Sequence, residues 1–384
     1  MNKTEKGYSK MGLSRCRWCY EKNVKKVFTT EKLPTYIWPS KKEDPLYQEG
    51  ELYLCETCGH LQLQDMTDEF ISSLYENYVF IQDIPTIHER RIKFLQTHIG
   101  DSIRKDLKSL DVGGGVNSIF FQLPQSKLET TIVDFNVCDK SKEMVDHFIE
   151  GDFVQYPFKN KKFDLIFSYH CAEHLNNPRP ALEKISELLE EDGFLIIEVP
   201  DIEAVVEKRP YYSVFHEHIN CFHFEFFHYA FTSLGLKYIA SERENFCMHF
   251  IFKKSSSKPV LPAPPVKKAR QIVESYKENI QKTTQKINQL LGPYKNKKIG
   301  LYGAGGSTNL FIANYPILNE LCSVCFDRDT LKHGLAIGKN RMEILPPNKI
   351  DEYSLDYLLF VYKDIFEIMK TKTKTKCIDL STCF

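Results

Sequence analysis

The sequence lacks an excess of charge of either sign and lacks any long apolar run. Its 51 Lys and Arg residues equal its 51 Asp and Glu residues, so no net field attracts a polyanion, which argues against a nucleic-acid partner. Nowhere do the ~18 consecutive apolar residues of a membrane-spanning helix occur. The opening residues MNKTEKGYSKMGLSR also lack the apolar core of a signal peptide. We therefore expect a cytoplasmic protein with no membrane partner.

The chain is too long for a single ordinary domain. At 384 residues it exceeds the ~250 to 300 residues at which one core stops growing. Residues 1–75 carry paired cysteines, and residues 76–254 alternate strand and helix signals, which favours a parallel sheet covered by helices. Residues 255–265 are rich in Pro and Ser and read as an exposed linker. A long helix then opens a C-terminal α/β region, 266–384. The pattern predicts an α/β protein with a small N-terminal module.

Four cysteines form two C-x-x-C pairs, Cys16 with Cys19 and Cys55 with Cys58. Two such turns close a tetrahedral shell of thiolates, and zinc suits four sulfur ligands with no open position. This spacing predicts a structural Zn²⁺ site. Iron in a rubredoxin-like site and free buried thiols are the alternatives. His60, beside the second pair, is a possible substitute ligand.

A glycine cluster follows an apolar strand signal at Asp111. Gly113 and Gly115 allow a sharp turn and a close backbone approach to a ligand. We expect a helix after this loop and then a strand that ends in Asp134, whose carboxylate is placed to accept hydrogen bonds from ribose hydroxyls. Asp152 lies in a later loop, where an adenine amino group can be read. A nicotinamide dinucleotide is the alternative ligand, although its G-x-G-x-x-G fingerprint does not fit this loop.

This ordered set resembles the class I S-adenosylmethionine (SAM) dependent methyltransferases. The stretch FDLIFSYHCAEHLNNPRPALEKISELLEEDGFLIIEVPD carries much of the resemblance. The resemblance implies a Rossmann-like core with Asp111, Gly113 and Gly115 around the methionine end of SAM, Asp134 at the ribose and Asp152 at the adenine. The loop departs from the family pattern at its third glycine, which is Asn117 in this chain.

A histidine segment, His216-Glu217-His218, precedes the aromatic run CFHFEFFHYAF. On a strand, His216 and His218 would face the same side. A metal site is one interpretation, but no third ligand stands at a familiar spacing. An imidazole in an aromatic pocket also suits a general base that works near neutral pH.

A second glycine loop, GLYGAGG, follows a strand signal in the C-terminal region and opens a helix. The backbone N–H groups around Gly303 and Gly305 are suited to holding a diphosphate. Thr308 replaces the third glycine of a dinucleotide fingerprint. We expect either nucleotide-sugar binding or a structural role for this loop, with a nicotinamide enzyme as a further alternative.

The order of these parts resembles a sugar C-methyltransferase family that alkylates the carbon beside the keto group of a nucleotide-linked 4-keto-deoxysugar. The similarity covers nearly the whole chain. It implies a nucleotide-sugar substrate, His218 as base, and Glu217 and His216 as groups that orient it or stabilise the enolate. It also implies that Tyr78 faces the substrate, and it points to polysaccharide or natural-product biosynthesis.

Two phenylalanines depart from this family. Phe215 and Phe80 stand where tyrosines are usual, and the loss of both hydroxyls removes hydrogen-bonding capacity while ring packing is retained. O- or N-methylation of a related sugar nucleotide, and a degenerate methyltransferase fold that only binds, therefore remain alternatives. The sequence leaves the choice between a monomer and a homodimer open.

Overall fold

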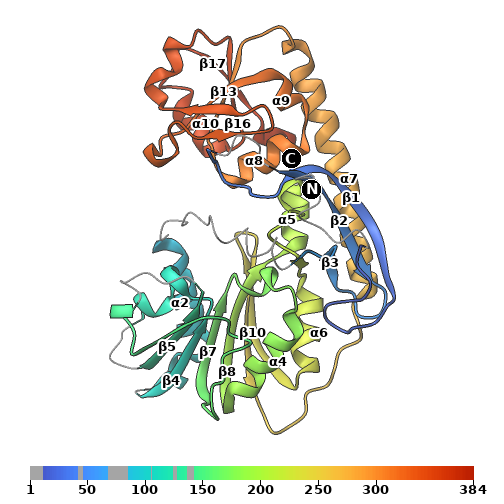
Figure 1. The fold of residues 1–384 in the computed structure, drawn as a ribbon, viewed down its shortest axis with the longest axis vertical. Coiled ribbons are helices and arrows are strands. Elements are labelled where there is room, and N and C mark those ends of the chain that lie inside the picture. The colour runs from blue at the N-terminus through green and yellow to red at the C-terminus, as the bar shows by residue number, and fades with distance from the viewer. Residues whose placement is uncertain (1–11, 42–45, 68–84, 105, 124–127, 136–141) are drawn as a thin grey trace, which may run out of the picture.

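The computed structural model describes residues 12–41, 46–67, 85–104, 106–123, 128–135 and 142–384. A seven-stranded sheet and a six-stranded sheet form two separate bodies, and a four-stranded sheet lies beside both of them (Figure 1). Both larger sheets are flanked by helices, so the expected α/β class is confirmed. None of the helices in these described segments has the length and apolar character that a membrane crossing needs.

The four-stranded sheet belongs mainly to the N-terminal region. It comprises β1 (Val24–Pro34), β2 (Tyr47–Cys55), β3 (Leu61–Leu63) and β9 (Asn220–Cys221), all antiparallel, in the order β1-β2-β3-β9. The last strand comes from a distant part of the chain, directly after the histidine segment. That segment is therefore fixed to the N-terminal sheet by backbone hydrogen bonds.

The seven-stranded sheet has the order β10-β11-β8-β7-β4-β5-β6. Its strands are β4 (Leu107–Val112), β5 (Leu128–Asp134), β6 (His147–Glu150), β7 (Phe163–Tyr169), β8 (Leu189–Pro200), β10 (Leu236–Glu244) and β11 (Cys247–Lys254). Only β11 runs antiparallel to its neighbours. The chain moves from β4 outward to β6 and then returns to β7 on the other side of β4. Such a reversal opens a crevice at the carboxyl ends of the strands, where α/β proteins bind ligands.

Helices α2 (Pro85–Ile99), α4 (Pro178–Leu188), α5 (Ile202–Lys208) and α6 (Phe224–Ser233) accompany this sheet. The segment after the first glycine loop differs from expectation. The sequence suggested a helix there, but the structure has two short 3-10 turns, Gly115–Asn117 and Ile119–Phe121. The Ser118 hydroxyl between them bonds the Asp111 carboxylate, an interaction that favours a tight turn over a regular helix.

The C-terminal body is a doubly wound sheet with the order β14-β15-β13-β12-β16-β17. Its strands are β12 (Ile299–Tyr302), β13 (Cys322–Phe326), β14 (Ala336–Ile337), β15 (Met342–Leu345), β16 (Tyr357–Phe360) and β17 (Lys376–Asp379), and its helices are α8 (Gly306–Asn314), α9 (Ile317–Leu321) and α10 (Lys363–Met369). All strands but β14 are parallel. The expected C-terminal α/β region is thereby confirmed, and its sheet is Rossmann-like.

Helix α7 (Val266–Leu291) joins the N-terminal sheet to the C-terminal body. Ala269 and Tyr276 in its first half pack in one core with β2 and β3, whereas Ile287 and Leu291 in its second half pack in the core of the C-terminal body. Full burial of an Ile or Leu side chain stabilises a fold by about 1.5–3 kcal/mol. Because helix α7 buries side chains in both cores, it couples the two bodies.

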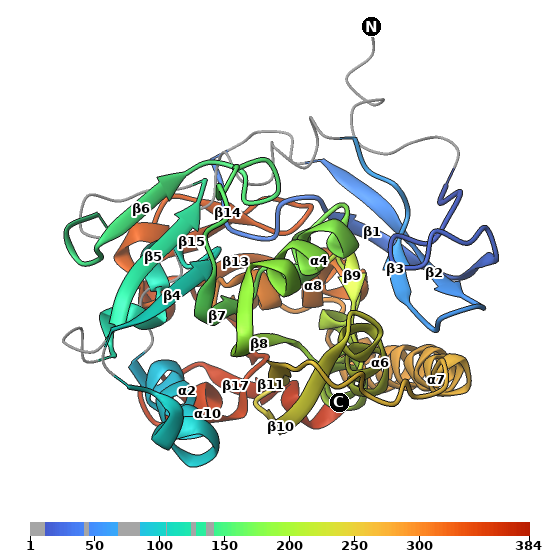
Figure 2. The ribbon, with the colours of Figure 1, turned by 90° about the horizontal axis from the view of Figure 1, so that it is seen from below.

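The chain after β1 crosses into the C-terminal body as well. Ser40 forms a β-bridge with Ala336, and the side-chain amide of Asn309 donates to the Ile37 carbonyl at 2.9 Å. Figure 1 shows α7 running alongside β1 and β2, and Figure 2 shows β14 across the molecule from α7. The N-terminal region therefore contacts both larger bodies and fixes their relative position.

Candidate active site

The first glycine loop lies at the carboxyl end of β4. Gly113 and Gly115 have φ angles of +77° and +42°, a region that favours glycine. At Gly114 an added Cβ atom would lie 2.4 Å from the Asp111 carboxylate, so this position, which the sequence reasoning did not single out, also requires glycine. The loop wraps closely around a buried acid.

The Asp111 side chain is fully buried. Its Oδ2 atom accepts a hydrogen bond from the Ser118 hydroxyl at 2.6 Å, and its Oδ1 atom has no hydrogen-bond partner among the described residues. Burial raises the pKa of Asp111 to about 6, against the influence of Ser118 and Arg91. A buried carboxylate with an unused acceptor fits the cationic methionine end of SAM.

Asp134 and Asp152 lie at the same edge of the sheet. Asp134 ends β5, and its backbone carbonyl accepts from Gly151 N at 3.0 Å. Asp152 follows directly and its Oδ1 atom accepts from Val154 N at 2.7 Å. The five residues expected around SAM thus come from three adjacent strand ends, although the contact of Asp152 also has a purely structural function, which is to cap a turn.

The histidine segment is a turn, so the shared face that His216 and His218 would have on a strand does not arise. His218 N donates to the Phe215 carbonyl at 3.1 Å, and β9 begins only at Asn220. The physical reason is tertiary: the His216 ring turns toward the N-terminal sheet. Its Nε2 atom lies 3.3 Å from the Leu33 carbonyl oxygen and 3.1 Å from that of Gln48.

His218 lies between aromatic rings. The centroid of its ring is 4.2 Å from that of Phe215 and 4.9 Å from that of His174. Burial and the neighbouring His174 lower the pKa of His218 to about 3. The imidazole is therefore neutral at pH 7, and with a pKa this far below 7 it needs a nearby negative charge to stabilise its protonated form before it can act as an effective base.

Glu217 and His216 are more deeply buried than His218. Burial raises the pKa of Glu217 to about 7 and lowers that of His216 to about 4. The Oε1 atom of Glu217 has no hydrogen-bond partner within the described part of the chain. Glu217 can thus exist as a protonated acid near neutral pH, whereas the contacts of His216 suit a positioning role.

Sequence reasoning missed Glu173 and His174. Both lie in a 3-10 turn, Ala172–His174, that follows β7. The His174 Nδ1 atom lies 2.7 Å from the Glu217 carbonyl oxygen, and ligand atoms of Glu173, His174 and His218 lie within 4.8 Å of one another. An acid beside a histidine just after a parallel strand was the available signal, but nothing in the local sequence connects it to a segment more than 40 residues away.

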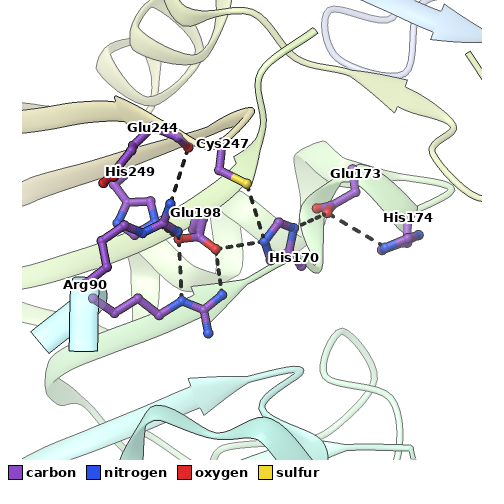
Figure 3. Close-up of polar contacts among 9 residues, drawn as sticks. Arg90, His170, Glu173, His174, Glu198, Glu244, Cys247 and His249 are labelled. Atoms are coloured by element: carbon purple, nitrogen blue, oxygen red, sulfur yellow. Dashed lines mark hydrogen bonds and ion pairs between the residues drawn. The ribbon is translucent and has the colours of Figure 1, made fainter. Parts of the chain in front are cut away.

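A buried ionic cluster centres on Glu198 of β8 (Figure 3). Its carboxylate contacts Arg90 at 2.7 Å, Arg91 at 2.6 Å and the His170 Nε2 atom at 2.7 Å. His249 of β11 contacts it as well. Several cations around one buried carboxylate hold the pKa of Glu198 well below its ordinary value, with the His170 hydrogen bond as the largest favourable cause against burial. The cluster ties helix α2 to the carboxyl edge of the sheet.

The cysteine quartet is brought together by the fold. The Sγ atoms of Cys16 and Cys58 are 3.7 Å apart, and those of Cys19 and Cys55 are 3.5 Å apart. A tetrahedral zinc ion with Zn–S bonds of ~2.3 Å separates its sulfur ligands by about 3.8 Å, so the four thiols fit such an ion. His60 lies 3.9 Å from the Cys16 sulfur through Nδ1 and stacks on Phe226, which places it beside the quartet.

The second glycine loop is partly engaged within the protein. The amide of Ala304 donates to the Asp327 carboxylate at 2.7 Å, and Gly306 packs against Ile37, which a Cβ atom there would approach to 2.7 Å. Gly303 has a φ of +97°, and no described atom lies within 4 Å of a Cβ added at Gly305. Gly303 and Gly305 therefore offer a more open backbone than Gly306. Tyr78, expected to face the substrate, lies outside the described residues.

Two family models match the chain in sequence order. A "Methyltransferase domain" matches residues 86–241, and a "C-methyltransferase C-terminal domain" matches residues 267–377. These matches support a SAM-dependent C-methyltransferase. The two matches agree with the methyltransferase core and the C-methyltransferase-type C-terminal domain that the resemblance implied. A relative, C-methyltransferase NovU of Streptomyces niveus, is 24% identical over 216 residues, which cover 51% of this chain and 50% of NovU. The alignment thus spans about half the length of that relative.

Solved methyltransferases are among the similar structures. N-methyltransferase NodS from Bradyrhizobium japonicum is 15% identical and covers 46% of this chain and 100% of its own, with a TM-score of 0.35. The 1,6-didemethyltoxoflavin-N1-methyltransferase of Burkholderia thailandensis is 15% identical and covers 49% of this chain and 86% of its own, with a TM-score of 0.38.

Proposed function

We propose that this protein transfers a methyl group from SAM to the carbon beside the ketone of a nucleotide-linked keto-deoxysugar, with His218 as the base. The observation that carries the proposal is the neutral His218 imidazole packed between Phe215 and His174. The preceding residue of the same turn, Glu217, has a carboxyl group whose pKa is raised to about 7. Enolate formation requires a base and a hydrogen-bond donor to the developing oxyanion.

The cofactor is assigned to the carboxyl edge of the seven-stranded sheet. Asp111, Gly113 and Gly115 would hold the methionine end, Asp134 the ribose and Asp152 the adenine. When bound, SAM supplies an electrophilic methyl group. The protein contributes a buried acceptor on Asp111 and glycines at which the main chain can come close to the ligand.

Deprotonation is assigned to His218. The C–H bond beside a ketone is acidified because the electron pair passes to the carbonyl oxygen as the proton leaves. His218 takes that proton, and the Glu217 carboxyl group, still protonated near neutral pH, donates a hydrogen bond to the developing oxyanion. The enolate carbon is then the nucleophile, and no metal ion is needed for this step.

His216 and the N-terminal sheet position these groups. Because the His216 ring bonds to carbonyls of Leu33 and Gln48, the histidine segment cannot shift without disturbing β1 and β2. A structural Zn²⁺ held by Cys16, Cys19, Cys55 and Cys58 would fix that sheet in turn. The zinc site therefore supports the chemistry indirectly, through the backbone.

The nucleotide part of the substrate is assigned to the C-terminal loop at Gly303 and Gly305. An open backbone at Gly305 and the start of helix α8 favour a diphosphate there. The Asp327 carboxylate already accepts the hydrogen bond of the Ala304 amide. That amide is therefore not free for the diphosphate, which is assigned to the glycine side of the loop.

A mass-spectrometric screen tests the proposal. Purified protein is incubated with SAM and a panel of nucleoside-diphosphate sugars, with and without a 4-keto group. The account expects a gain of one methyl group on keto sugars only, retained after mild acid hydrolysis to the free sugar and located on carbon by NMR. A methyl group on oxygen or nitrogen would instead support the alternative acceptor, and tight SAM binding without any transfer would support a binding protein.

A further inference from the structure

Glu173 carries a buried carboxylate that the proposed reaction does not yet use. Only 1% of its surface is exposed. Its Oε1 atom lies 3.1 Å from the His170 Nδ1 atom and 3.8 Å from the His174 Nε2 atom. Its Oε2 atom has no hydrogen-bond partner among the residues that the structure describes. Burying a carboxylate this deeply is costly unless positive charge compensates it.

The compensating charge comes from His170. This residue directly follows β7 and has a φ of +52°, a strained conformation for a residue other than glycine. Its amide donates to the Glu198 carbonyl at 2.9 Å. In this position the imidazole bridges two acids, Glu173 through Nδ1 and Glu198 through Nε2. Figure 3 shows the row that results, from the arginine-clamped Glu198 through His170 to Glu173 and His174.

The row of side chains from Glu198 to Glu173 ends beside His218, the proposed base. Glu173 and His218 present ligand atoms within 4.8 Å of each other, a range in which an opposite charge favours the ionised form of its neighbour. The charged groups that act on His218 are Glu173, which favours its protonation, and His174 and His170, which oppose it. Glu173 is thus the acidic group that can compensate a proton arriving on His218.

We propose that Glu173 is a positioning residue for the base: its carboxylate stabilises the imidazolium that forms when His218 takes the substrate proton, while His170 and Glu198 hold that carboxylate in place. The inference rests on the proposed function, because it assigns the proton acceptor to His218. The proton moves from the substrate carbon to His218 and the electron pair to the ketone oxygen, so Glu173 itself neither gains nor loses a proton.

The pattern of charges agrees with this role. The His170 hydrogen bond is the largest favourable cause that lowers the pKa of Glu173 to about 2 against burial, so the carboxylate stays ionised throughout the neutral range. Arg90 and Arg91 neutralise Glu198, which leaves the positive charge of His170 to face Glu173. The row therefore keeps the Glu173 carboxylate ionised beside His218, where it favours protonation of His218 while His170 and His174 oppose it.

Two Glu173 variants separate charge from shape. Glu173→Gln keeps the size and the contact with His170 but removes the charge. The experiment follows deuterium uptake from heavy water into a nucleoside-diphosphate 4-keto-6-deoxyhexose, with SAM binding and thermal unfolding as parallel readouts. We expect kcat for uptake to fall about 10-fold, equivalent to one pKa unit of lost stabilisation, with KM unchanged and Glu173→Asp partly active. Glu183→Gln, on an exposed side chain of α4 whose recorded ion pair is with Arg179, is the matched control.

Rescue by a small carboxylate distinguishes charge from structure. Formate should restore uptake in Glu173→Ala in a concentration-dependent way, whereas chloride at equal ionic strength should not. A wild-type rate in Glu173→Gln, or a slow Glu173→Ala that formate does not restore, would overturn the inference. Wild-type protein without any uptake would instead refute the proposed function.

A readout that needs no sugar substrate tests the role of Glu173 even if the wild-type protein shows no deuterium uptake. Carbethoxylation of His218 by diethylpyrocarbonate at pH 7, followed by peptide mass spectrometry, reports the nucleophilicity of its imidazole directly. It should slow several-fold in Glu173→Gln and remain unchanged in Glu183→Gln. An unchanged rate in Glu173→Gln would count against the charge partnership, whatever the substrate proves to be.

Discussion

The Nδ1 atom of His174 lies 2.7 Å from the backbone carbonyl oxygen of Glu217. This contact fastens the turn that ends β7 to the turn that carries His218. The carboxyl edge of the seven-stranded sheet, where SAM is assigned, is thereby joined to the side of the site where the base is assigned. The side-chain amide of Asn220, which donates to the Leu175 carbonyl at 2.7 Å, links the same two segments.

Replacement of His218 should slow proton abstraction and methyl transfer but leave the affinity for SAM unchanged. In His218→Gln we expect deuterium uptake and methyl transfer to fall by about 10²- to 10⁴-fold, the usual contribution of a positioned general base. SAM affinity measured by calorimetry should stay within experimental error, because the cofactor residues lie on other strand ends. His147→Gln, at a half-exposed position on β6, is the control. Full activity of His218→Gln would contradict the assignment.

Replacement of Asp134, the residue assigned to the ribose, should weaken the binding of SAM. Asp134→Asn removes a charged acceptor, and hydrogen bonds to charged groups contribute about 1.5–3 kcal/mol, so the Kd for SAM should rise by roughly 10- to 100-fold. Calorimetric titration measures it directly. Glu129→Gln, at an exposed position on the same strand, should bind SAM as the wild type does. Equal affinities for the two variants would place the ribose elsewhere.

The cysteine quartet should hold one zinc ion per chain. Elemental analysis is expected to find it in the wild type and in Cys377→Ser, and to find it lost in Cys58→Ser. Because the metal would close the module that carries β1 and β2, Cys58→Ser should also unfold at a clearly lower temperature. Metal-free wild-type protein with the same melting temperature as Cys58→Ser would refute the site, and iron in place of zinc would change only the identity of the metal.

The buried acid at Glu217 predicts a specific dependence of stability on pH. A raised pKa means that the native state binds the proton more tightly than the unfolded state. The resulting stability is full below the ordinary Glu pKa and is lost as pH rises toward about 7. Glu217→Gln removes this loss, so its advantage over the wild type in chemical denaturation should be near zero at pH 4 and grow to on the order of 1–3 kcal/mol at pH 8.

A matched variant checks the origin of that effect. Glu207→Gln, at an exposed position near the end of α5, should follow the wild type across the whole pH range. The contrary result is a difference in the free energy of unfolding between Glu217→Gln and the wild type that is independent of pH. In that case the Glu217 carboxyl group is not a protonated buried acid near neutrality, and it cannot donate a hydrogen bond to the oxyanion.

The second glycine loop offers a test of nucleotide-sugar binding that leaves the fold unchanged. A Cβ atom added at Gly305 meets no described atom within 4 Å, so Gly305→Val should melt near the wild-type temperature. If a diphosphate approaches the backbone there, the variant should bind the nucleotide sugar at least 10-fold more weakly. Gly292→Ala, which also has free space, is the control. Unchanged affinity in Gly305→Val would assign the loop a structural role.

The cofactor edge was predictable from the sequence because parallel strands share an edge. Strand signals end at Asp111 and Asp134, so a parallel sheet brings these two residues together whatever the details of the loops. Asp152 was expected only in a later loop, and strand β6 is what places it at this edge. The cysteine quartet was predictable for a similar reason, since two C-x-x-C turns can share one ion. These features depend on local spacing and on strand direction alone.

The rest of the site depends on contacts between distant segments. Glu198 and His170 meet because β7 and β8 are neighbours, and His249 joins them from an antiparallel strand that no local pattern places there. The turn at His216 arises because its ring bonds to carbonyls of β1 and β2, whereas the local sequence is compatible with a strand. The part played by Ile37 in covering Gly306 likewise requires the whole fold.

Deuterium uptake tests the central claim most directly. Wild-type protein is incubated in heavy water with a nucleoside-diphosphate 4-keto-6-deoxyhexose in the absence of SAM, and the sugar is followed by proton NMR. The account predicts that one carbon-bound hydrogen beside the ketone is replaced, and that His218→Gln abolishes this exchange. Retention of every carbon-bound hydrogen by a sugar that the same protein methylates when SAM is added would contradict enolate formation at His218.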